Sequence, residues 1–485
     1  MISANKKGRV KKLASAIVLA ILLTFILPLS SALALSFTTT QITNNPYTDW
    51  EPQIDGDRVV WRGYDGDDSE VFLYDIPTKT TTQITNNIYL DDYFAKIDGN
   101  WIIWQGWDGS DWEIFLYNIA DKTTKQLTNN YENDLSPRLD GERAVWRGSD
   151  GYDFEIFLYD IVTAATTNIS NNGFYNYEPQ IDGNRVVWVG EQDNLDYEIF
   201  LYDIDTTTNT QITDNIYRDV GAQIDDNKVV WHGDDGSDYE IFLHDTVNAT
   251  TANISNNGFD DNDPQIDGNR VVWCQYDGSD HEIFLYDFLA ARTTRITDNG
   301  SSDVEPRVFG DWVAWREYDG NDNEIFVYNT STSTTTQITD NNYDDYLPEM
   351  GDDQVVWQSY DGSDFEIFLA APATISATID IYPDTLNLKS KDNYITCYVE
   401  LPEGYSVSNI DFGSVKLNAT VPAKQKPTSV GDHDRDGIAD LMVRFDRSAI
   451  QALAYPGEVT LTVTGMVNLT QFEGRDTIKV ISKGK

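Results

Sequence analysis

Short runs of apolar residues, separated by segments rich in Asp, Asn and Gly, recur along most of the chain. Runs such as 58–61 (RVVW) and 71–74 (VFLY) are continuous rather than strictly alternating, which is typical of strands covered on both faces. The threonine-rich run 80–85 also favours a strand, because β-branched residues suit the extended backbone. Asp-Gly pairs such as 55–56 suit tight hairpins. The pattern therefore predicts an all-β protein.

One unit of sequence is repeated through this region at a nearly constant spacing. Each copy has a tryptophan at the end of an apolar run, and these recur every 42 or 43 residues: Trp61, Trp104, Trp146, Trp188, Trp231, Trp273, Trp315 and Trp357. Four short strands in such a period predict one blade of a β-propeller, with the tryptophans packed between blades rather than forming a sugar platform. A solenoid or β-helix is the alternative, although its repeats are usually shorter.

The two ends of the repeat region predict how the propeller closes. A threonine-rich strand at 37–43 precedes the first blade, whereas no such strand follows the last blade, 347–369. The N-terminal strand would complete the last blade and remove two open sheet edges. Residues 35–371 are therefore predicted to form an eight-bladed β-propeller closed by the N-terminal strand.

The order of segments within a unit resembles a known family of repeats. Segments of the type TQITNN, PQIDG, RVVW, YDGSD and EIFLYD follow one another as in TolB-like propeller repeats, which are relatives of WD repeats. This resemblance implies a propeller that serves as a binding platform in periplasmic and cell-surface proteins or as the regulatory propeller of a peptidase. The sequence has no G-x-S-x-G elbow and no hydrolase domain after the repeats, so the resemblance does not settle an activity.

The pattern changes near Pro372. Segments of residues 372–485, such as 394–401 and 458–467, alternate between apolar and polar residues, and no convincing long helix is visible. This pattern predicts a small C-terminal β-sandwich domain.

An acidic loop in this tail has the spacing of a calcium site. Oxygen ligands at alternate positions with glycine at the sixth, here Gly437, are typical of Ca²⁺ loops. The expected ligands are four side chains and one main-chain carbonyl, from Asp432, Asp434, Asp436, Asp440 and Ile438 respectively. Position 12 is Val443 instead of Glu, so the loop is not an EF-hand and resembles the loops of dockerin-like and other extracellular β-domains. An acidic turn without metal is the alternative.

The composition excludes some partners. The chain has 80 Asp and Glu residues against 34 Lys and Arg residues, a formal charge of −46. Binding to nucleic acid or to anionic lipid headgroups depends on Lys and Arg, so we expect neither. Two cysteines, Cys274 and Cys397, are too few for a disulfide framework.

The first 34 residues have the order of a secretory signal. A basic segment is followed by the apolar run 13–27 and by small residues that end at Ala34. An uncleaved membrane anchor is the alternative. We expect an exported protein, extracellular or at the cell surface, without a transmembrane segment once the signal is removed. Glycosylation is compatible with seven N-x-S/T sequons, at Asn168, Asn248, Asn253, Asn299, Asn329, Asn418 and Asn468.

Acidic residues recur in the loops that should share one face of the propeller. An acidic face could attract cations or a basic partner. The plainer interpretation, which we favour at this point, is turn chemistry and solubility. Glutamates also open one strand of every unit, and eight equivalent carboxylates indicate a repeated structural hydrogen bond rather than a catalytic pair: Glu70, Glu113, Glu155, Glu198, Glu240, Glu282, Glu324 and Glu366.

Two sets of variable positions are the best candidates for ligand binding. The first, which we name the channel ring, should face the central channel: Gln53, Lys96, Arg138, Gln180, Gln223, Gln265, Arg307 and Glu349. Its three cations could hold an anionic or carboxylate-bearing group. The second, ranked lower, is the post-tryptophan ring: Arg62, Gln105, Arg147, Val189, His232, Cys274, Arg316 and Gln358.

No Ser/His/Asp set or histidine metal triad is visible in the sequence, which has only four histidines. The sequence therefore predicts a non-enzymatic binding or scaffold protein for a protein or cell-envelope ligand. The alternative is an extracellular carbohydrate- or peptide-active enzyme that uses carboxylates of the acidic face, and a purely structural envelope component is a third interpretation.

Overall fold

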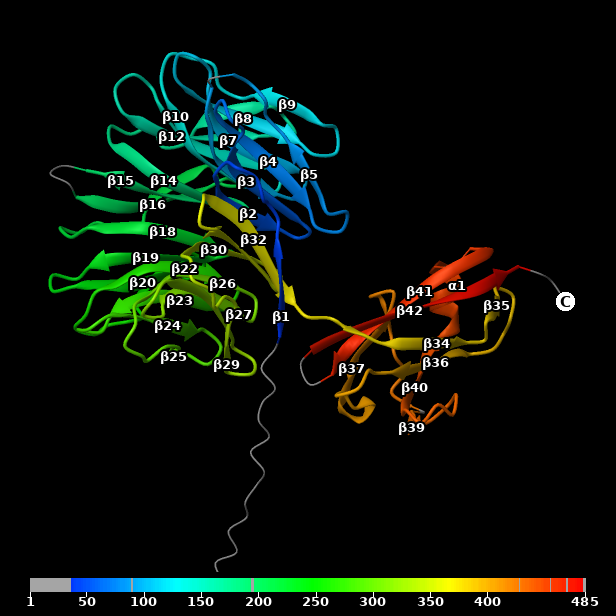
Figure 1. Cartoon of the computed structure of the whole chain (residues 1–485). Helices are drawn as coiled ribbons and strands as arrows, with labels where there is room; N and C mark the ends of the chain where they lie inside the picture. The colour runs from blue at the N-terminus through cyan, green and yellow to red at the C-terminus, as the bar shows by residue number, and fades with distance from the viewer. Residues whose placement is uncertain are drawn as a thin grey trace, which may run out of the picture. The chain divides into compact units, whose positions relative to one another are not determined.

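Figure 1 shows the computed structural model of the chain, which describes residues 36–88, 90–192, 196–426, 428–453, 455–467 and 470–482. The expected signal segment 1–34 and the sequon at Asn468 lie outside the described residues. Within these ranges no helix is both long and apolar enough to cross a membrane.

Each repeat forms an antiparallel four-stranded sheet. The first consists of β2 (Asp49–Asp55), β3 (Arg58–Tyr64), β4 (Ser69–Asp75) and β5 (Thr80–Gln83). The next three are β6 (Asp92–Asp98), β7 (Trp101–Trp107), β8 (Trp112–Asn118), β9 (Thr123–Gln126); β10 (Asp134–Asp140), β11 (Arg143–Ser149), β12 (Phe154–Asp160), β13 (Ala165–Asn168); and β14 (Tyr175–Asp182), β15 (Arg185–Glu191), β16 (Tyr197–Asp203), β17 (Thr208–Gln211).

Three more sheets follow the same order. They are β18 (Asp219–Asp225), β19 (Lys228–Asp234), β20 (Tyr239–Asp245), β21 (Thr250–Asn253); β22 (Asp261–Asp267), β23 (Arg270–Tyr276), β24 (His281–Asp287), β25 (Arg292–Arg295); and β26 (Asp303–Phe309), β27 (Trp312–Tyr318), β28 (Asn323–Asn329), β29 (Thr334–Gln337). The last sheet joins both ends of the repeat region, in the order β1 (Phe37–Gln41), β32 (Phe365–Pro372), β31 (Gln354–Tyr360), β30 (Asp345–Gly351).

The sheets have a propeller-like arrangement (Figure 1). The first strands of successive sheets lie against one another, from β2 and β6 onward, and β30 of the last sheet contacts β2 of the first. The prediction of an all-β fold made of four-stranded repeats is confirmed.

The repeated tryptophans form the core between sheets. All eight are at most 1% exposed. Trp61 stacks on Phe72 of the neighbouring strand, with 5.7 Å between ring centroids, and its Nε1 donates to Asp49 Oδ1 at 2.7 Å. The same indole hydrogen bond occurs in each sheet, with an Asn replacing the Asp only at position 176. The interpretation of the tryptophans as core residues is confirmed.

The glutamates that open one strand of every unit connect each sheet to the next. Glu70 is fully buried, and its Oε1 accepts a hydrogen bond at 2.8 Å from the main-chain N–H of Asn87, in the loop that leads to β6. An equivalent Asn N–H binds each of the other seven glutamates. The interpretation of this set as a repeated structural hydrogen bond is confirmed.

The tail, taken by itself, contains two sheets that share one apolar core. One sheet has the order β33 (Ile375–Ser376), β42 (Thr470–Ile481), β41 (Gly457–Val467), β37 (Ile410–Leu417), β38 (Val421–Pro422), with β35 (Thr385–Asn387) also paired to β42. The other has the order β34 (Thr378–Tyr382), β36 (Tyr394–Glu400), β40 (Asp440–Asp446), β39 (Ser429–Gly431). Both contribute fully buried residues, such as Phe445 and Phe472, and two short helices complete the unit, η1 (Val407–Asn409) and α1 (Arg447–Leu453).

The tryptophan hydrogen bond should contribute measurably to stability. Trp146→Phe removes the indole donor from Asp134 Oδ1, whose bond to Trp146 measures 2.9 Å, and leaves that buried oxygen without its partner. Trp188→Phe is the matched control, because Asn176 Oδ1 keeps a second donor, Asn172 Nδ2, at 3.2 Å. In urea unfolding we expect Trp146→Phe to lose about 1–2 kcal/mol more free energy of unfolding than Trp188→Phe. Equal losses would contradict this role for the hydrogen bond.

Candidate functional site

A β-bulge in the first strand of each sheet forms a ring of strained residues. In β2 the pairing with β3 shifts between Trp50 and Gln53, and Glu51 between them has a φ of 54°. The equivalent residues also have positive φ: Phe94, Ser136, Glu178, Gly221, Asp263, Glu305 and Leu347. Bulges re-aim side chains, and strained backbone of this kind clusters at functional sites.

This bulge ring was missed from the sequence. Segments of the type PQIDG predict a strand that starts near Pro52 in the first copy, whereas β2 begins at Asp49. The acidic residue that precedes proline in several copies, such as Glu51, Glu178 and Asp263, was the available signal.

Each sheet contributes one residue of the channel ring. This residue lies two positions after the bulge residue of its sheet and is partly exposed. Neighbouring members bind each other. Lys96 Nζ donates to Gln53 Oε1 at 2.8 Å, and Arg138 Nε donates to Gln180 Oε1 at 3.1 Å. Arg307 Nε lies 3.1 Å from a carboxylate oxygen of Glu349. One of the three cations is thus paired within the ring, and binding of an anionic ligand there stays a prediction.

The charges of the channel ring act on one another. The pKa of Lys96 is lowered to about 7, chiefly by burial and next by the charge of Arg138, while the charge of Glu349 opposes both effects. These residues belong to three different sheets, β6–β9, β10–β13 and the sheet that contains β30. The ring therefore behaves as one electrostatic unit.

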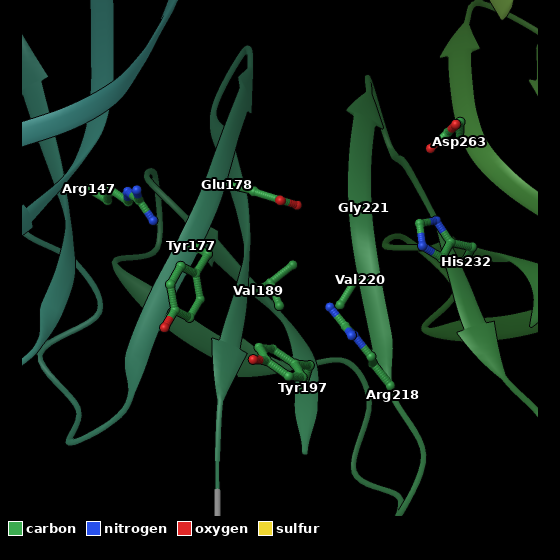
Figure 2. A pocket seen from close by; sticks show the side chains of 10 residues that line it. All are labelled: Arg147, Tyr177, Glu178, Val189, Tyr197, Arg218, Val220, Gly221, His232 and Asp263. Atoms are coloured by element: carbon green, nitrogen blue, oxygen red, sulfur yellow. The ribbon is translucent and has the colours of Figure 1, made fainter. Parts of the chain in front are cut away.

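A pocket of about 500 Å³ lies beside the bulge ring and spans four consecutive sheets (Figure 2). Its walls include three members of the post-tryptophan ring and three of the bulge ring. The residues that line it are Arg147, Tyr177, Glu178, Val189, Tyr197, Arg218, Val220, Gly221, His232 and Asp263. The lower-ranked ring of the sequence analysis therefore contributes to this pocket.

His232 is the central titratable group of this pocket. Its Nδ1 is buried and has no hydrogen-bond partner among the described residues. Burial lowers the pKa of His232, and the charge of Asp263 opposes this effect. A Cβ at position 221 would lie 2.8 Å from the His232 ring, so glycine leaves the space that the imidazole needs. Burial thus favours the neutral imidazole, which is the form that can accept a proton.

Two arginines and two tyrosines occupy the opposite part of the pocket. The Arg218 guanidinium lies 4.6 Å from the ring centre of Tyr197, and that of Arg147 lies 5.5 Å from the ring centre of Tyr177. In Figure 2 the side chains of Glu178 and Arg218 point toward the middle of the pocket. This set can hold an anionic group between cations while aromatic surfaces contact the rest of a ligand.

The acidic loop of the tail folds around its own carboxylates. Gly437 N donates to Asp432 Oδ2 at 3.2 Å, and Asp436 N donates to Asp434 Oδ1 at 3.2 Å. His433 N donates to Asp440 Oδ2 at 2.5 Å. The predicted ligands thus lie on one compact turn.

The chain matches no family model, and no curated protein matches its sequence. Solved structures share its fold. Dipeptidyl peptidase 4 of Porphyromonas gingivalis matches with a TM-score of 0.51 at 9% identity, over 75% of this chain and 65% of that one. A structure from a study of two prolyl endopeptidases matches with a TM-score of 0.50 at 9% identity, over 66% of this chain and 55% of that one, so this chain spans about half its length.

A third match is the β-propeller domain of the Trilobed protease from Pyrococcus furiosus, with a TM-score of 0.44 at 10% identity, over 61% of this chain and 96% of that one. At such identities the comparisons bear on the fold alone.

These comparisons contradict the prediction of a non-enzymatic binding or scaffold protein, because the two structures named first are of peptidases. The prediction rested on the absence of a nucleophile elbow and of a histidine cluster in the sequence. The pocket could not be predicted from the sequence, because His232 and Asp263 lie in separate repeats and come together only in the folded chain.

The charge coupling in the channel ring can be measured directly. The rate at which an amine-specific label modifies Lys96, followed by mass spectrometry against pH, should report a pKa near 7. Glu349→Gln removes a negative charge that favours the ammonium, so the pKa of Lys96 should fall further. The labelling rate of the exposed Lys122, measured in the same protein, corrects for the change of reagent reactivity with pH. A Lys96 pKa near its ordinary 10.5 would contradict the arrangement.

Proposed function

We propose that this chain is an exported enzyme that acts on a carbohydrate or a peptide bound in the pocket around His232. The observation that carries this proposal is the buried and unpartnered Nδ1 of His232 beside Asp263, in a pocket whose middle is reached by Glu178 and Arg218. A neutral imidazole with a free nitrogen, next to carboxylates and cations, is suited to acid–base chemistry.

Each group has a chemical role in this proposal. His232 takes up a proton as general base, and the Asp263 carboxylate stabilises the imidazolium that forms. Glu178 serves as the second proton-transfer group. Arg147 and Arg218 bind an anionic group of the substrate, while Tyr177 and Tyr197 contact its apolar surface. In this proposal the propeller itself carries out the reaction.

The proposed enzyme is an eight-bladed propeller of the TolB-like type, closed by the N-terminal strand and followed by a β-sandwich at 372–485. Pairing of Thr39 with Ala370 and the contact of β30 with β2 support the closed ring. The basic and apolar order of residues 1–34 supports export, to the extracellular space or the cell surface.

We also propose that the tail loop binds Ca²⁺ through Asp432, Asp434, Asp436, Asp440 and the Ile438 carbonyl. Main-chain N–H groups at 436 and 437 already turn toward the first two carboxylates, as in a loop shaped for an ion. The role of the ion would be structural, holding the connection between β39 and β40.

Replacing His232 tests the enzyme proposal. The purified chain is assayed against a panel of neutral and uronic polysaccharides and of acidic and neutral peptides, with product release as the readout. His232→Gln should lower kcat/KM about 10²–10⁴-fold on every substrate that the chain converts. His244→Gln, on the third strand of the same sheet and outside the pocket, is the matched control and should retain activity.

The pH profile makes this test specific. Because burial keeps the pKa of His232 below its ordinary 6.5, activity should fall only when the pH drops below that value. Asp263→Asn removes a charge that raises this pKa, so the acidic limb should move to lower pH. No turnover of any panel member, or full activity of His232→Gln, would overturn the proposal.

The tail loop contains a convenient protease site, because Arg435 lies between two predicted calcium ligands. Ca²⁺ should slow tryptic cleavage after Arg435 several-fold relative to EDTA, and Asp434→Asn should abolish this protection. Cleavage after the exposed Lys79, in another turn, is the internal control. Equal cleavage rates after Arg435 with and without Ca²⁺ would count against the site.

A further inference from the structure

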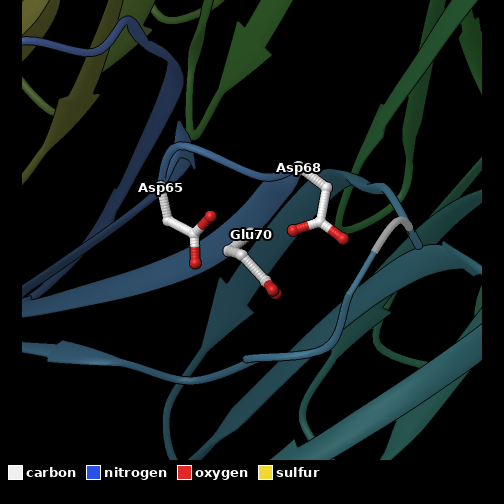
Figure 3. A group of neighbouring side chains, drawn as sticks. All are labelled: Asp65, Asp68 and Glu70. Atoms are coloured by element: carbon white, nitrogen blue, oxygen red, sulfur yellow. The ribbon is translucent and has the colours of Figure 1, made fainter.

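Three carboxylates meet in the loop between the second and third strands of several sheets. In the first sheet these are Asp65, Asp68 and Glu70, whose side chains lie around a common space (Figure 3). One oxygen of each lies within 4.8 Å of the others. The same geometry recurs in other sheets, in Asp108, Asp111 and Glu113; Asp150, Asp153 and Glu155; Asp235, Asp238 and Glu240; and Asp277, Asp280 and Glu282. We name these groups the blade trios.

Buried oxygens of the blade trios lack hydrogen-bond partners. Glu70 is 0% exposed and Asp68 is 4% exposed, yet Glu70 Oε2 and Asp68 Oδ1 accept no hydrogen bond from any described residue. Elsewhere in the described chain the same is true of Glu113 Oε2, Glu282 Oε2, Glu324 Oε2, Glu366 Oε2, both carboxylate oxygens of Asp111 and Asp322, and Asp238, Asp280 and Asp364 Oδ1. Buried polar atoms in native proteins almost always have partners, so these oxygens need a group that the described residues do not supply, either a water molecule or a cation.

In two repeats a serine hydroxyl binds the second oxygen of the glutamate. Glu155 Oε2 and Glu240 Oε2 accept hydrogen bonds from the hydroxyls of Ser170 and Ser255. In the other six repeats, including the one that contains Arg295, the equivalent glutamate oxygen has no partner among the described residues.

One repeat carries its own cation in this place. Arg295 Nη2 lies 2.9 Å from Asp277 Oδ2 and 2.7 Å from Glu282 Oε1, two members of a blade trio. Arg295 occupies the last position of β25, where the first sheet has Gln83, which donates a hydrogen bond to Asp65 Oδ2 at 3.1 Å. A glutamine amide cannot neutralise the carboxylates, whereas the guanidinium does. The chain thus contains an internal example of a cation held by this arrangement.

We propose that the blade trios bind Ca²⁺, except where Arg295 takes the place of the ion. Ca²⁺ prefers oxygen ligands, and it accepts several carboxylates together with main-chain oxygens and water. Each ion would cross-link two sheets, because Asp68 Oδ2 accepts a hydrogen bond from Leu90 N at 2.7 Å and Glu70 binds Asn87 N, both in the loop toward the next sheet. These sites are separate from the pocket around His232 and from the tail loop.

Reciprocal substitutions at one position test this proposal. Bound ⁴⁵Ca²⁺ is counted by equilibrium dialysis of the full chain. Gln83→Arg introduces the guanidinium found in the Arg295 repeat and should remove one bound Ca²⁺ per chain. Arg295→Gln should add one. Because the tail loop is unchanged in both variants, its ion does not affect the differences.

A second variant guards against misfolding. Glu113→Gln keeps an oxygen for the hydrogen bond from Asn130 N, which measures 2.6 Å, but removes one carboxylate ligand, and it should also remove one Ca²⁺. Circular dichroism checks that each variant is folded. Unchanged stoichiometry in folded Gln83→Arg and Arg295→Gln would overturn the proposal, as would Ca²⁺ binding that Asp434→Asn in the tail loop abolishes completely. Binding of Mg²⁺ without Ca²⁺ would overturn the assignment to calcium.

Discussion

The hydrogen bond between an asparagine N–H and a buried glutamate connects every sheet of the repeat region to the next. In the first sheet it joins Asn87 N to Glu70 Oε1 at 2.8 Å. It uses only one of the two carboxylate oxygens, and it places a charged group where water does not reach it. A buried charge is costly unless it is paired. The same contact that orders the sheets therefore creates a demand for positive charge beside each of them.

Different repeats stabilise the buried glutamate with different groups. Ser170 and Ser255 donate to the second oxygen of their glutamates, and Arg295 supplies a full positive charge in a third repeat. At Glu70 the second oxygen has no hydrogen-bond partner among the residues described, and the same is true at Glu282, where Arg295 contacts only the first oxygen. In our proposal a cation completes every blade trio except the one that already contains Arg295. The large excess of acidic residues is partly a consequence of this architecture.

Function sits where the repeats differ. Packing fixes the identity of Trp61 and its equivalents, but it leaves the bulge residues and the residues after the tryptophans free to vary. At one place this freedom combines Gly221, His232 and Asp263 from three adjacent strands of two sheets. Glycine provides room, histidine provides a neutral base and aspartate provides the charge that steadies its protonated form. No single repeat contains the whole set.

Much of the fold could be predicted from the sequence, because the period of the tryptophans and the apolar runs reports local strand formation. The role of the eight glutamates followed from their equivalence, and the structure confirms it. The pocket could not be predicted in the same way. The acidic residue before proline, such as Glu178, does not by itself indicate a strained backbone, and the meeting of His232 with Asp263 depends on how neighbouring sheets pack. Nor could the sequence show that Arg295 reaches Glu282, since the two residues belong to different strands.

The central claim is that the buried carboxylates of the repeats require a cation. It is tested most directly by a crystal structure grown with Ca²⁺ and measured at a wavelength where calcium scatters anomalously. The account predicts an anomalous peak among Asp65, Asp68 and Glu70, and none among Asp277, Glu282 and Arg295. Ordered water without anomalous signal at Glu70, or a calcium peak that displaces Arg295, would contradict it.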